Sequence, residues 1–306
     1  MSPPVTRVCV AGAGAIGSLL AGHLAQVADV SVLVRREDHA RALNEQGLRV
    51  SGRSSHTARV VAGLDPGGLP EPELVIVACK GTDLDAVAGR LEGHWPEATV
   101  MTIQNGLGAE EHVAARGGWP LLSSVTFMSG TRHDDTHVEY ILDTATWIGP
   151  YRDTTPDDAR RVAGLIVSAG LKAEAFDDLR PVQWSKLIFN ATVNAVAALT
   201  GLPHDFHFAE GLLGDLVHAL VDEGKAVAKA AGVVLHDDPW EMNVLATRRG
   251  HAHYPSMLED VEARRPTEIE LISGALVREA ERQGRPAPLH TALYRLVKAK
   301  EASYST

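Results

Sequence analysis

Residues 7–17 read Arg-Val-Cys-Val-Ala-Gly-Ala-Gly-Ala-Ile-Gly, a short apolar run that leads into a glycine-rich turn. The run at 7–11 is typical of a buried strand, and residues 15–27 have the spacing of a helix. In such a turn the first glycine makes the bend, the second lets the backbone approach a pyrophosphate, and the third lets helix and strand pack closely. We therefore predict a dinucleotide site at the helix N-terminus, the alternative being a tight turn without a ligand. Its residues are Gly12, Ala13, Gly14, Ala15, Ile16 and Gly17.

Short apolar runs alternate with helical patterns through the first half of the chain. Strands are expected at 7–11, 29–34, 74–79 and 99–103, with helices at 15–27, 37–46 and 82–91. This alternation predicts a parallel sheet with right-handed crossovers. Further strands at 121–128, 138–142 and 145–148 predict an antiparallel or mixed extension of the same sheet, closed by a helix at 156–169 and a strand at 171–176.

The second half of the chain is helical in pattern. Helices are expected at about 181–200, 208–232, 239–249, 267–283 and 289–302. The 306 residues suffice for about two domains, which we predict at 1–177 and 178–306.

Composition excludes several classes of protein. The net charge of −10 argues against a nucleic-acid or anionic-membrane partner, and no apolar run is long enough for a membrane span. The two cysteines, Cys9 and Cys79, lie in apolar runs, as is typical of reduced core residues in a cytoplasmic protein. The tight histidine clusters, 204–207 and 251–253, lack the spacing of a helical ligand pair, so we predict loop histidines exposed to solvent and no metal site.

The end of the second strand indicates which dinucleotide binds. An acidic residue there suits the ribose hydroxyl of NAD, whereas an arginine suits the 2′-phosphate of NADP. Glu37 has the spacing for NAD, but we interpret it and Asp38 as the first turn of the next helix, where acids complement the dipole. Arg35 then occupies the strand end, and we predict NADP(H); Arg36 is equally well a solvated charge.

Polar residues follow two further strands. Lys80 comes directly after Cys79, and Gln104-Asn105-Gly106 follows Ile103. Ligands of open parallel sheets bind at the carboxyl ends of strands, so Asn105 could bond a nicotinamide or a substrate. An exposed lysine and a common Asn-Gly turn are the alternatives.

A polar stripe runs along an otherwise apolar helix in the second half. Lys186, Asn190 and Asn194 recur every fourth residue and so share one narrow face. Buried polar groups are costly unless partnered, and burial lowers the pKa of a lysine, which makes it a usable general acid. The stripe indicates either a site or a structural polar seam.

A second cluster lies at 254–270. Thr267 and Glu270 fit a capping box that would start the helix at 267–283. That box leaves Glu268 unexplained except as a partner of the helix dipole.

Together these residues resemble the ketopantoate reductase family over nearly the whole chain. The resemblance depends on the glycine turn, Arg35, Lys80, residues 104–106, the Lys-Asn-Asn helix, and the stretch Pro-Ser-Met-Leu-Glu-Asp to Arg-Pro-Thr-Glu-Ile-Glu at 255–270. It implies an α/β fold with an N-terminal Rossmann-type doubly wound sheet, an all-α C-terminal domain, and an active site in the interdomain cleft. Departures at Ala195, His204 and Ser273 leave the substrate open.

The resemblance also implies roles for individual residues. Lys186 would protonate the ketone oxygen, and Glu268 would bind a substrate hydroxyl, help to order Lys186 and contact the cofactor. Asn105, Asn190, Asn194 and Ser256 would hold the substrate. Arg35, Lys80 and Asn105 would contact NADP(H).

We therefore expect an NADPH-dependent reductase of 2-dehydropantoate in pantothenate biosynthesis. The alternatives are a reductase of another small 2-keto acid and a non-catalytic NADP-binding regulator. A homodimer is one possible assembly.

Overall fold

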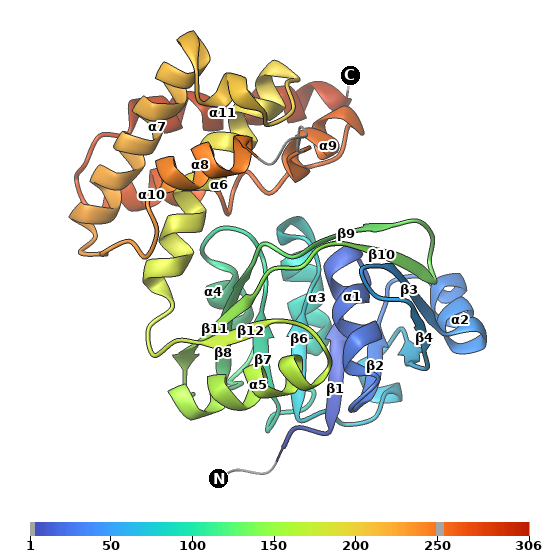
Figure 1. Ribbon diagram of the computed structural model, residues 1–306. Helices are drawn as coiled ribbons and strands as arrows, with labels where there is room; N and C mark the ends of the chain where they lie inside the picture. Colours follow the sequence, from blue (N-terminus) through green and yellow to red (C-terminus); the bar gives the residue numbers. More distant parts are fainter. Residues whose placement is uncertain (1–3, 249–253, 306) are drawn as a thin grey trace. The chain divides into compact units, whose positions relative to one another are not determined.

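The computed structural model describes residues 4–248 and 254–305 (Figure 1). The chain divides into two compact units, which we call the nucleotide unit and the helical unit. The nucleotide unit contains Met1–Gln104 and Ala109–Leu179, and the helical unit contains Asn105–Gly108 and Arg180–Thr306. The segment Asn105–Gly108 therefore folds with the helical unit, although the residues on both sides of it belong to the nucleotide unit. The sequence pattern does not indicate this.

The nucleotide unit is built on an eight-stranded sheet with the order β12-β11-β8-β7-β6-β1-β2-β5. All neighbouring strands between β8 and β5 in this order run parallel. Strand β11 is antiparallel to β8, and β12 is parallel to β11. The parallel sheet and its mixed extension are thus confirmed. The strands are β1 (Arg7–Ala11), β2 (Asp29–Leu33), β5 (Val61–Gly63), β6 (Leu74–Val77), β7 (Thr99–Thr102), β8 (Leu121–Thr126), β11 (Thr146–Arg152) and β12 (Ala173–Ala175).

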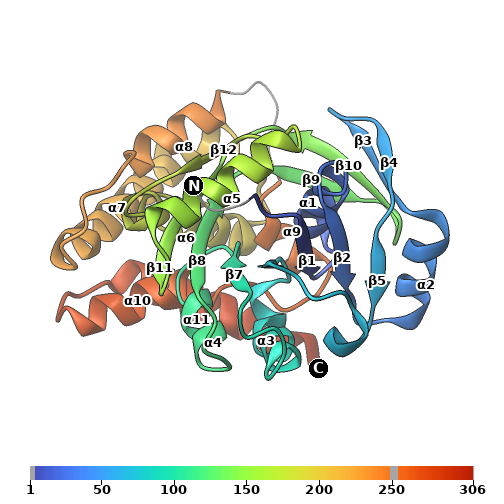
Figure 2. The same ribbon diagram turned by 90° about the horizontal axis from the view of Figure 1, so that it is seen from below.

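Helices cover both faces of this sheet, as a doubly wound fold requires. Figure 2 shows α5 on one face and α3 and α4 on the other. The helices and 3-10 turns of this unit are α1 (Ala15–Leu24), α2 (Glu37–Gln46), η1 (Pro66–Gly68), η2 (Gly81–Asp83), α3 (Leu84–Leu91), α4 (Ala109–Ala114) and α5 (Pro156–Ser168).

A second, four-stranded sheet corrects one expectation. The strand predicted at 138–142 does not extend the first sheet; it pairs in the order β4-β3-β10-β9. This sheet packs on α1, where a Cβ added at Gly22 would lie 2.6 Å from Val50 and one at Gly130 would lie 2.7 Å from Leu19. Because α1 has a sheet on each side, its residues from Gly17 to Leu24 are all buried. The strands are β3 (Leu48–Gly52), β4 (His56–Ala58), β9 (Ser129–Arg132) and β10 (His137–Leu142).

The helical unit is organised around α6. This helix contacts α7, α8, α9, α10 and α11, and most of its side chains are buried, as its apolar sequence predicts. No helix in the described part of the chain is long and apolar enough to cross a membrane. The elements are α6 (Arg180–Thr200), η3 (Phe206–Phe208), α7 (Gly211–Ala230), α8 (Pro239–Thr247), α9 (Ser256–Glu262), α10 (Ser273–Arg282), α11 (Pro288–Ala302) and η4 (Ser303–Ser305).

The helix expected at 267–283 begins six residues later, at Ser273, so the capping box is wrong. The Thr267 hydroxyl donates to Glu301 at 2.7 Å. The Glu270 carboxylate accepts from the Tyr294 hydroxyl at 2.9 Å. Both partners lie on α11, so contacts with a distant helix replace the local cap.

Candidate active site

The glycine turn joins β1 to α1 as predicted. Gly12 has a φ of +110°, and a Cβ there would lie 2.7 Å from the backbone nitrogen of Cys79. A Cβ at Gly17 would lie 2.0 Å from the carbonyl oxygen of Gly12. Only glycine therefore fits at these two positions, which fix the bend and the approach of the helix to the strand.

Gly14 differs from the other two glycines. A Cβ built on it meets no atom within 4 Å. It is also the N-cap of α1, so the cap residue has no side chain to bond the backbone N–H groups, and the first turn carries no acid. The turn thus leaves open space in front of a helix N-terminus, which suits an anion such as a pyrophosphate.

The end of β2 separates the roles of two arginines. Glu37 and Asp38 lie in the first turn of α2, as expected. Arg36 donates to Asp38 at 2.8 Å and to both carboxylate oxygens of Asp135, so its charge is neutralised. The Arg35 side chain is 71% exposed and donates to Asp83 at 3.1 Å. Of the two arginines, Arg35 is therefore the one whose guanidinium stays mostly exposed at the end of β2.

The next strand ends are held by Gln104. This buried side chain donates to the carbonyl oxygens of Val77 at 2.8 Å and Cys79 at 2.9 Å, so it ties the end of β7 to the end of β6. Lys80 follows Cys79 and is exposed at the start of η2.

Three predicted residues meet in the helical unit. The Lys186 ammonium donates to Oδ1 of Asn105 at 2.7 Å, and Nδ2 of Asn105 donates to Oε2 of Glu268 at 3.0 Å. They come from α6, from the segment Asn105–Gly108 and from the turn before α10. The Asn105 amide thus links a cation to a carboxylate and fixes the ammonium with a neutral acceptor.

Burial controls the protonation of Lys186. The residue is 8% exposed, and this loss of hydration lowers the pKa of its ammonium from 10.5 to about 8. The negative charge of Glu268 acts in the opposite direction. Lys186 is therefore mostly protonated at neutral pH yet able to release its proton, which suits a general acid.

Asn190 and Asn194 continue the same face of α6, one and two turns beyond Lys186. Their side chains are 7% and 6% exposed. Within residues 4–248 and 254–305 neither side chain has a hydrogen-bond partner. Neither amide is among the fully buried polar groups without a partner, so both amides reach the surface of the unit and are available to polar groups of a ligand.

Two other expectations fare differently. Ser256 is exposed at the first position of α9, and in the described chain no hydrogen bond joins it to the Lys186 group. His204 is not exposed to solvent: it is 1% exposed and hydrogen-bonds Asn243 at 2.8 Å. The pair 251–253 lies outside the described residues, and within them no group of His, Cys, Asp or Glu could hold a metal ion.

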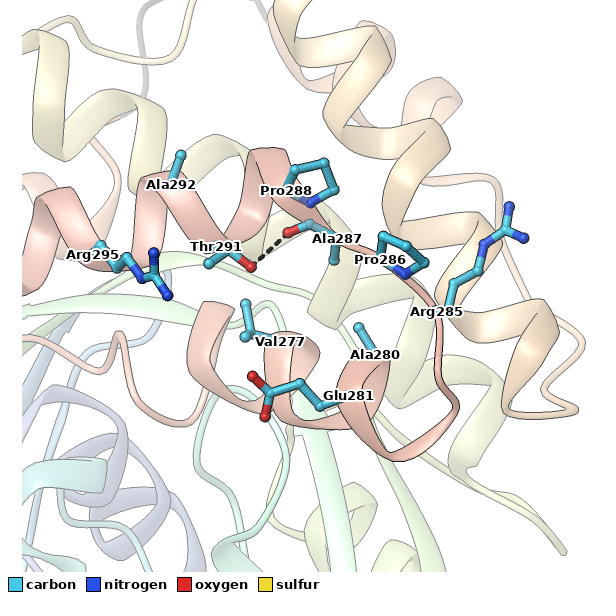
Figure 3. Close-up of a pocket in the computed structure, with 10 residues that line it drawn as sticks. All are labelled: Val277, Ala280, Glu281, Arg285, Pro286, Ala287, Pro288, Thr291, Ala292 and Arg295. Atoms are coloured by element: carbon cyan, nitrogen blue, oxygen red, sulfur yellow. Dashed lines mark hydrogen bonds between the residues drawn. The ribbon is translucent and has the colours of Figure 1, made fainter.

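A cavity of about 410 Å³ lies elsewhere in the helical unit, between α10 and α11 (Figure 3). Its polar lining consists of Glu281, Arg285, Thr291 and Arg295. The lining includes none of the predicted site residues, so this cavity is separate from the Lys186 group.

Sequence reasoning missed two residues. Asp83 pairs with Arg35, and the carbonyl oxygen of Leu271 accepts from the backbone nitrogen of Leu107 at 2.8 Å. No sequence signal identifies either, because Asp83 resembles an ordinary helix-start residue and Leu271 acts through its backbone.

Comparison with known families gives matches to both sequence halves. Residues 8–153 match the family described as ketopantoate reductase PanE/ApbA, and residues 178–301 match the description ketopantoate reductase PanE/ApbA C terminal. The 2-dehydropantoate 2-reductase of Archaeoglobus fulgidus is 31% identical over 97% of this chain and 99% of its own. That of Pyrococcus horikoshii is 28% identical over 97% and 98%.

Solved structures agree. A PanE/ApbA family ketopantoate reductase from Ralstonia eutropha superposes with a TM-score of 0.90 at 25% identity, covering 98% of this chain and all of the other. D-mandelate dehydrogenase with NADH and anilino(oxo)acetate reaches the same TM-score at 22% identity over the same shares, which shows a common fold. By fold and by both sequence matches, this chain belongs to the ketopantoate reductase family of pyridine-nucleotide oxidoreductases.

Proposed function

We propose that the protein reduces 2-dehydropantoate to pantoate with NADPH, as a step of pantothenate biosynthesis. The observation that carries this proposal is the partly buried chain of hydrogen bonds from the buried Lys186 through Asn105 to Glu268. This chain holds an ammonium that can release its proton beside a neutral amide and a carboxylate. Reduction of a ketone requires such a proton donor, because negative charge develops on the keto oxygen.

Lys186 has two tasks in this reaction. A bound reduced nicotinamide supplies the hydride that the keto carbon receives. Negative charge then develops on the keto oxygen, where the Lys186 ammonium stabilises it and finally delivers its proton. A pKa of about 8 leaves the ammonium protonated before the reaction and makes the neutral amine an acceptable product.

The remaining residues bind and orient. Asn190 and Asn194 offer amide groups that have no partner in the described chain, and we assign them to the substrate together with Ser256. Glu268 keeps Asn105 in place through its 3.0 Å hydrogen bond and is the acceptor for a substrate hydroxyl. The turn at residues 12–17 takes the pyrophosphate, and Arg35 and Lys80 take the phosphorylated ribose and the neighbouring part of the cofactor.

A reductase of another 2-keto acid is the second candidate. His204 and Ser273, which depart from the family pattern, are both fully buried in the helical unit. Ser273 donates to the carbonyl oxygen of Ala191, on the same helix as Asn190 and Asn194. D-mandelate dehydrogenase shares this fold and was solved with NADH, so the fold also serves another acid and another cofactor. A non-catalytic NADP-binding regulator is disfavoured, because it has no need of a buried lysine held beside a carboxylate.

The deciding experiment measures oxidation of NADPH by the purified protein with 2-dehydropantoate and, in parallel, with a panel of 2-keto acids. Selective turnover of 2-dehydropantoate is the expected result. Selective turnover of another acid would replace the substrate, and tight NADPH binding without turnover of any acid would favour the regulator. We also propose a cytoplasmic location, because no disulfide joins Cys9 and Cys79, as is usual for cysteines in a reducing compartment.

A further inference from the structure

The carboxylate of Asp83 does not cap the helix that follows it. Asp83 ends η2 and is the N-cap residue of α3, a position where an aspartate normally accepts from the first N–H groups of the helix. Here its side chain makes no such bond. Instead Oδ1 accepts from Nη1 of Arg35 at 3.1 Å.

The backbone that leads into Arg35 is held in place without this pair. The Arg90 guanidinium, which is half-buried on α3, donates to the carbonyl oxygen of Val34 at 2.9 Å and so fixes the backbone just before Arg35. An ion pair whose partners are 71% and 37% exposed adds little rigidity of its own. The main effect of Asp83 at the end of β2 is therefore its charge.

We infer that Asp83 determines how strongly the protein prefers NADPH over NADH, by weakening the attraction of Arg35 for the 2′-phosphate. The inference rests on the proposed function, in which Arg35 receives that phosphate. A phosphate monoester carries nearly two negative charges at neutral pH, whereas the corresponding group of NADH is a neutral hydroxyl. A carboxylate beside the guanidinium of Arg35 therefore repels the phosphate of NADPH and has almost no effect on the hydroxyl of NADH.

The neighbouring arginine does not compensate for this repulsion. Arg36 donates to Asp38 and to Asp135, so it brings no uncompensated charge to the strand end. A phosphate bound on the far side of the Arg35 guanidinium would lie about 6 Å from the Asp83 carboxylate, since one hydrogen-bond length of about 3 Å separates the guanidinium from each. In a water-like dielectric, repulsion at that distance corresponds to about a tenfold loss of affinity without salt and about a threefold loss at physiological salt.

The test is Asp83→Asn, which removes the charge and keeps a good N-cap residue, so that folding is preserved. Dissociation constants for NADPH and NADH are measured by isothermal titration calorimetry on the full chain. Asp85→Asn is the matched control, because Asp85 lies two residues further on, carries the same charge, and pairs with His112 at 2.9 Å instead of with Arg35.

We expect Asp83→Asn to bind NADPH about threefold to tenfold more tightly and NADH within twofold of the wild type, with the gain shrinking at high salt. Asp85→Asn should change either cofactor by less than twofold. Weaker NADPH binding in Asp83→Asn, or an equal change for both cofactors, would overturn the inference.

Arg35→Ala separates this inference from the proposed function. If that variant loses NADPH affinity but Asp83→Asn does not gain any, the phosphate site stands and the role of Asp83 is wrong. If Arg35→Ala binds NADPH as the wild type does, the proposed phosphate site fails and the inference about Asp83 fails with it.

Discussion

The carbonyl oxygen of Leu271 lies so close to Gly106 that a Cβ atom at position 106 would be 1.8 Å from it. The same oxygen accepts from the backbone nitrogen of Leu107 at 2.8 Å. This contact clamps the segment Asn105–Gly108 to the turn before α10. It thereby sets Asn105 between Lys186 and Glu268.

The first prediction tests this clamp with two glycines. Gly106 and Gly108 have φ angles of +97° and +104°, so alanine at either adds a backbone strain of about 1–2 kcal/mol. Only Gly106→Ala also collides with Leu271, because a Cβ at Gly108 meets no atom closer than 3.6 Å. We expect Gly106→Ala to lower kcat about 10- to 100-fold and Gly108→Ala to lower it far less. Equal losses of kcat at equal melting temperature would contradict the clamp.

The second prediction concerns the proton donor. Lys186→Ala should lower kcat by a factor between about 100 and 10,000, since it removes the general acid. NADPH affinity should survive, because the glycine turn belongs to the other unit. Lys300→Ala is the control: Lys300 is also in the helical unit but donates to the carbonyl oxygen of Ala198. The role of Lys186 is disproved if turnover in the variant equals that of the wild type.

Local patterns were enough to predict the parts of the site that lie on one element. The glycine turn and the stripe of Lys186, Asn190 and Asn194 follow from spacing alone, because strand and helix periodicity decide where those side chains point. The first sheet follows for the same reason, since its strands are continuous apolar runs covered on both faces.

Long-range contacts decide what the pattern could not. Asn105 and Glu268 are 163 residues apart in sequence, and only the folded chain brings them together. The start of α10 was misplaced because Thr267 and Glu270 bond to α11 instead of forming a local cap. The second sheet was not predicted because β10, although expected as a strand, pairs with β3, which lies far back along the chain and was not expected as a strand.

The third prediction concerns stability in acid. His290 is fully buried, its Nε2 lies 3.0 Å from the carbonyl oxygen of Leu220, and burial lowers the pKa of its imidazole from 6.5 to about 4. His290 therefore binds a proton below pH 6.5 in the unfolded chain, but only below about pH 4 in the folded chain. The free energy of unfolding should therefore decrease by about 3 kcal/mol as the pH falls from 6.5 to 4.

The variant His290→Gln keeps a hydrogen-bond donor for the carbonyl oxygen of Leu220 and removes the titrating imidazole. Denaturant unfolding between pH 7 and 4 should show a flatter pH dependence than the wild type. Exposed His218, which pairs with Asp222, is the control, and its substitution by glutamine should leave the wild-type slope. A slope unaffected by His290→Gln would show that other groups govern acid unfolding.

The fourth prediction links Glu268 to the pH dependence of catalysis. The reaction needs the protonated form of Lys186, so kcat should fall as the pH rises through about 8. The negative charge of Glu268 raises the pKa of the Lys186 ammonium against the effect of burial. Glu268→Gln removes that charge and should move the fall in activity to lower pH.

Glu270→Gln is the control for this shift. Its carboxylate lies two residues away but accepts from the Tyr294 hydroxyl, so its loss should leave the pH profile in place. Complete profiles of kcat from pH 5 to 10 measure both variants. A change in KM alone, with the same pH profile in Glu268→Gln and the wild type, would mean that Glu268 only binds substrate. A shift confined to Glu268→Gln identifies the carboxylate that sets the proton affinity of Lys186.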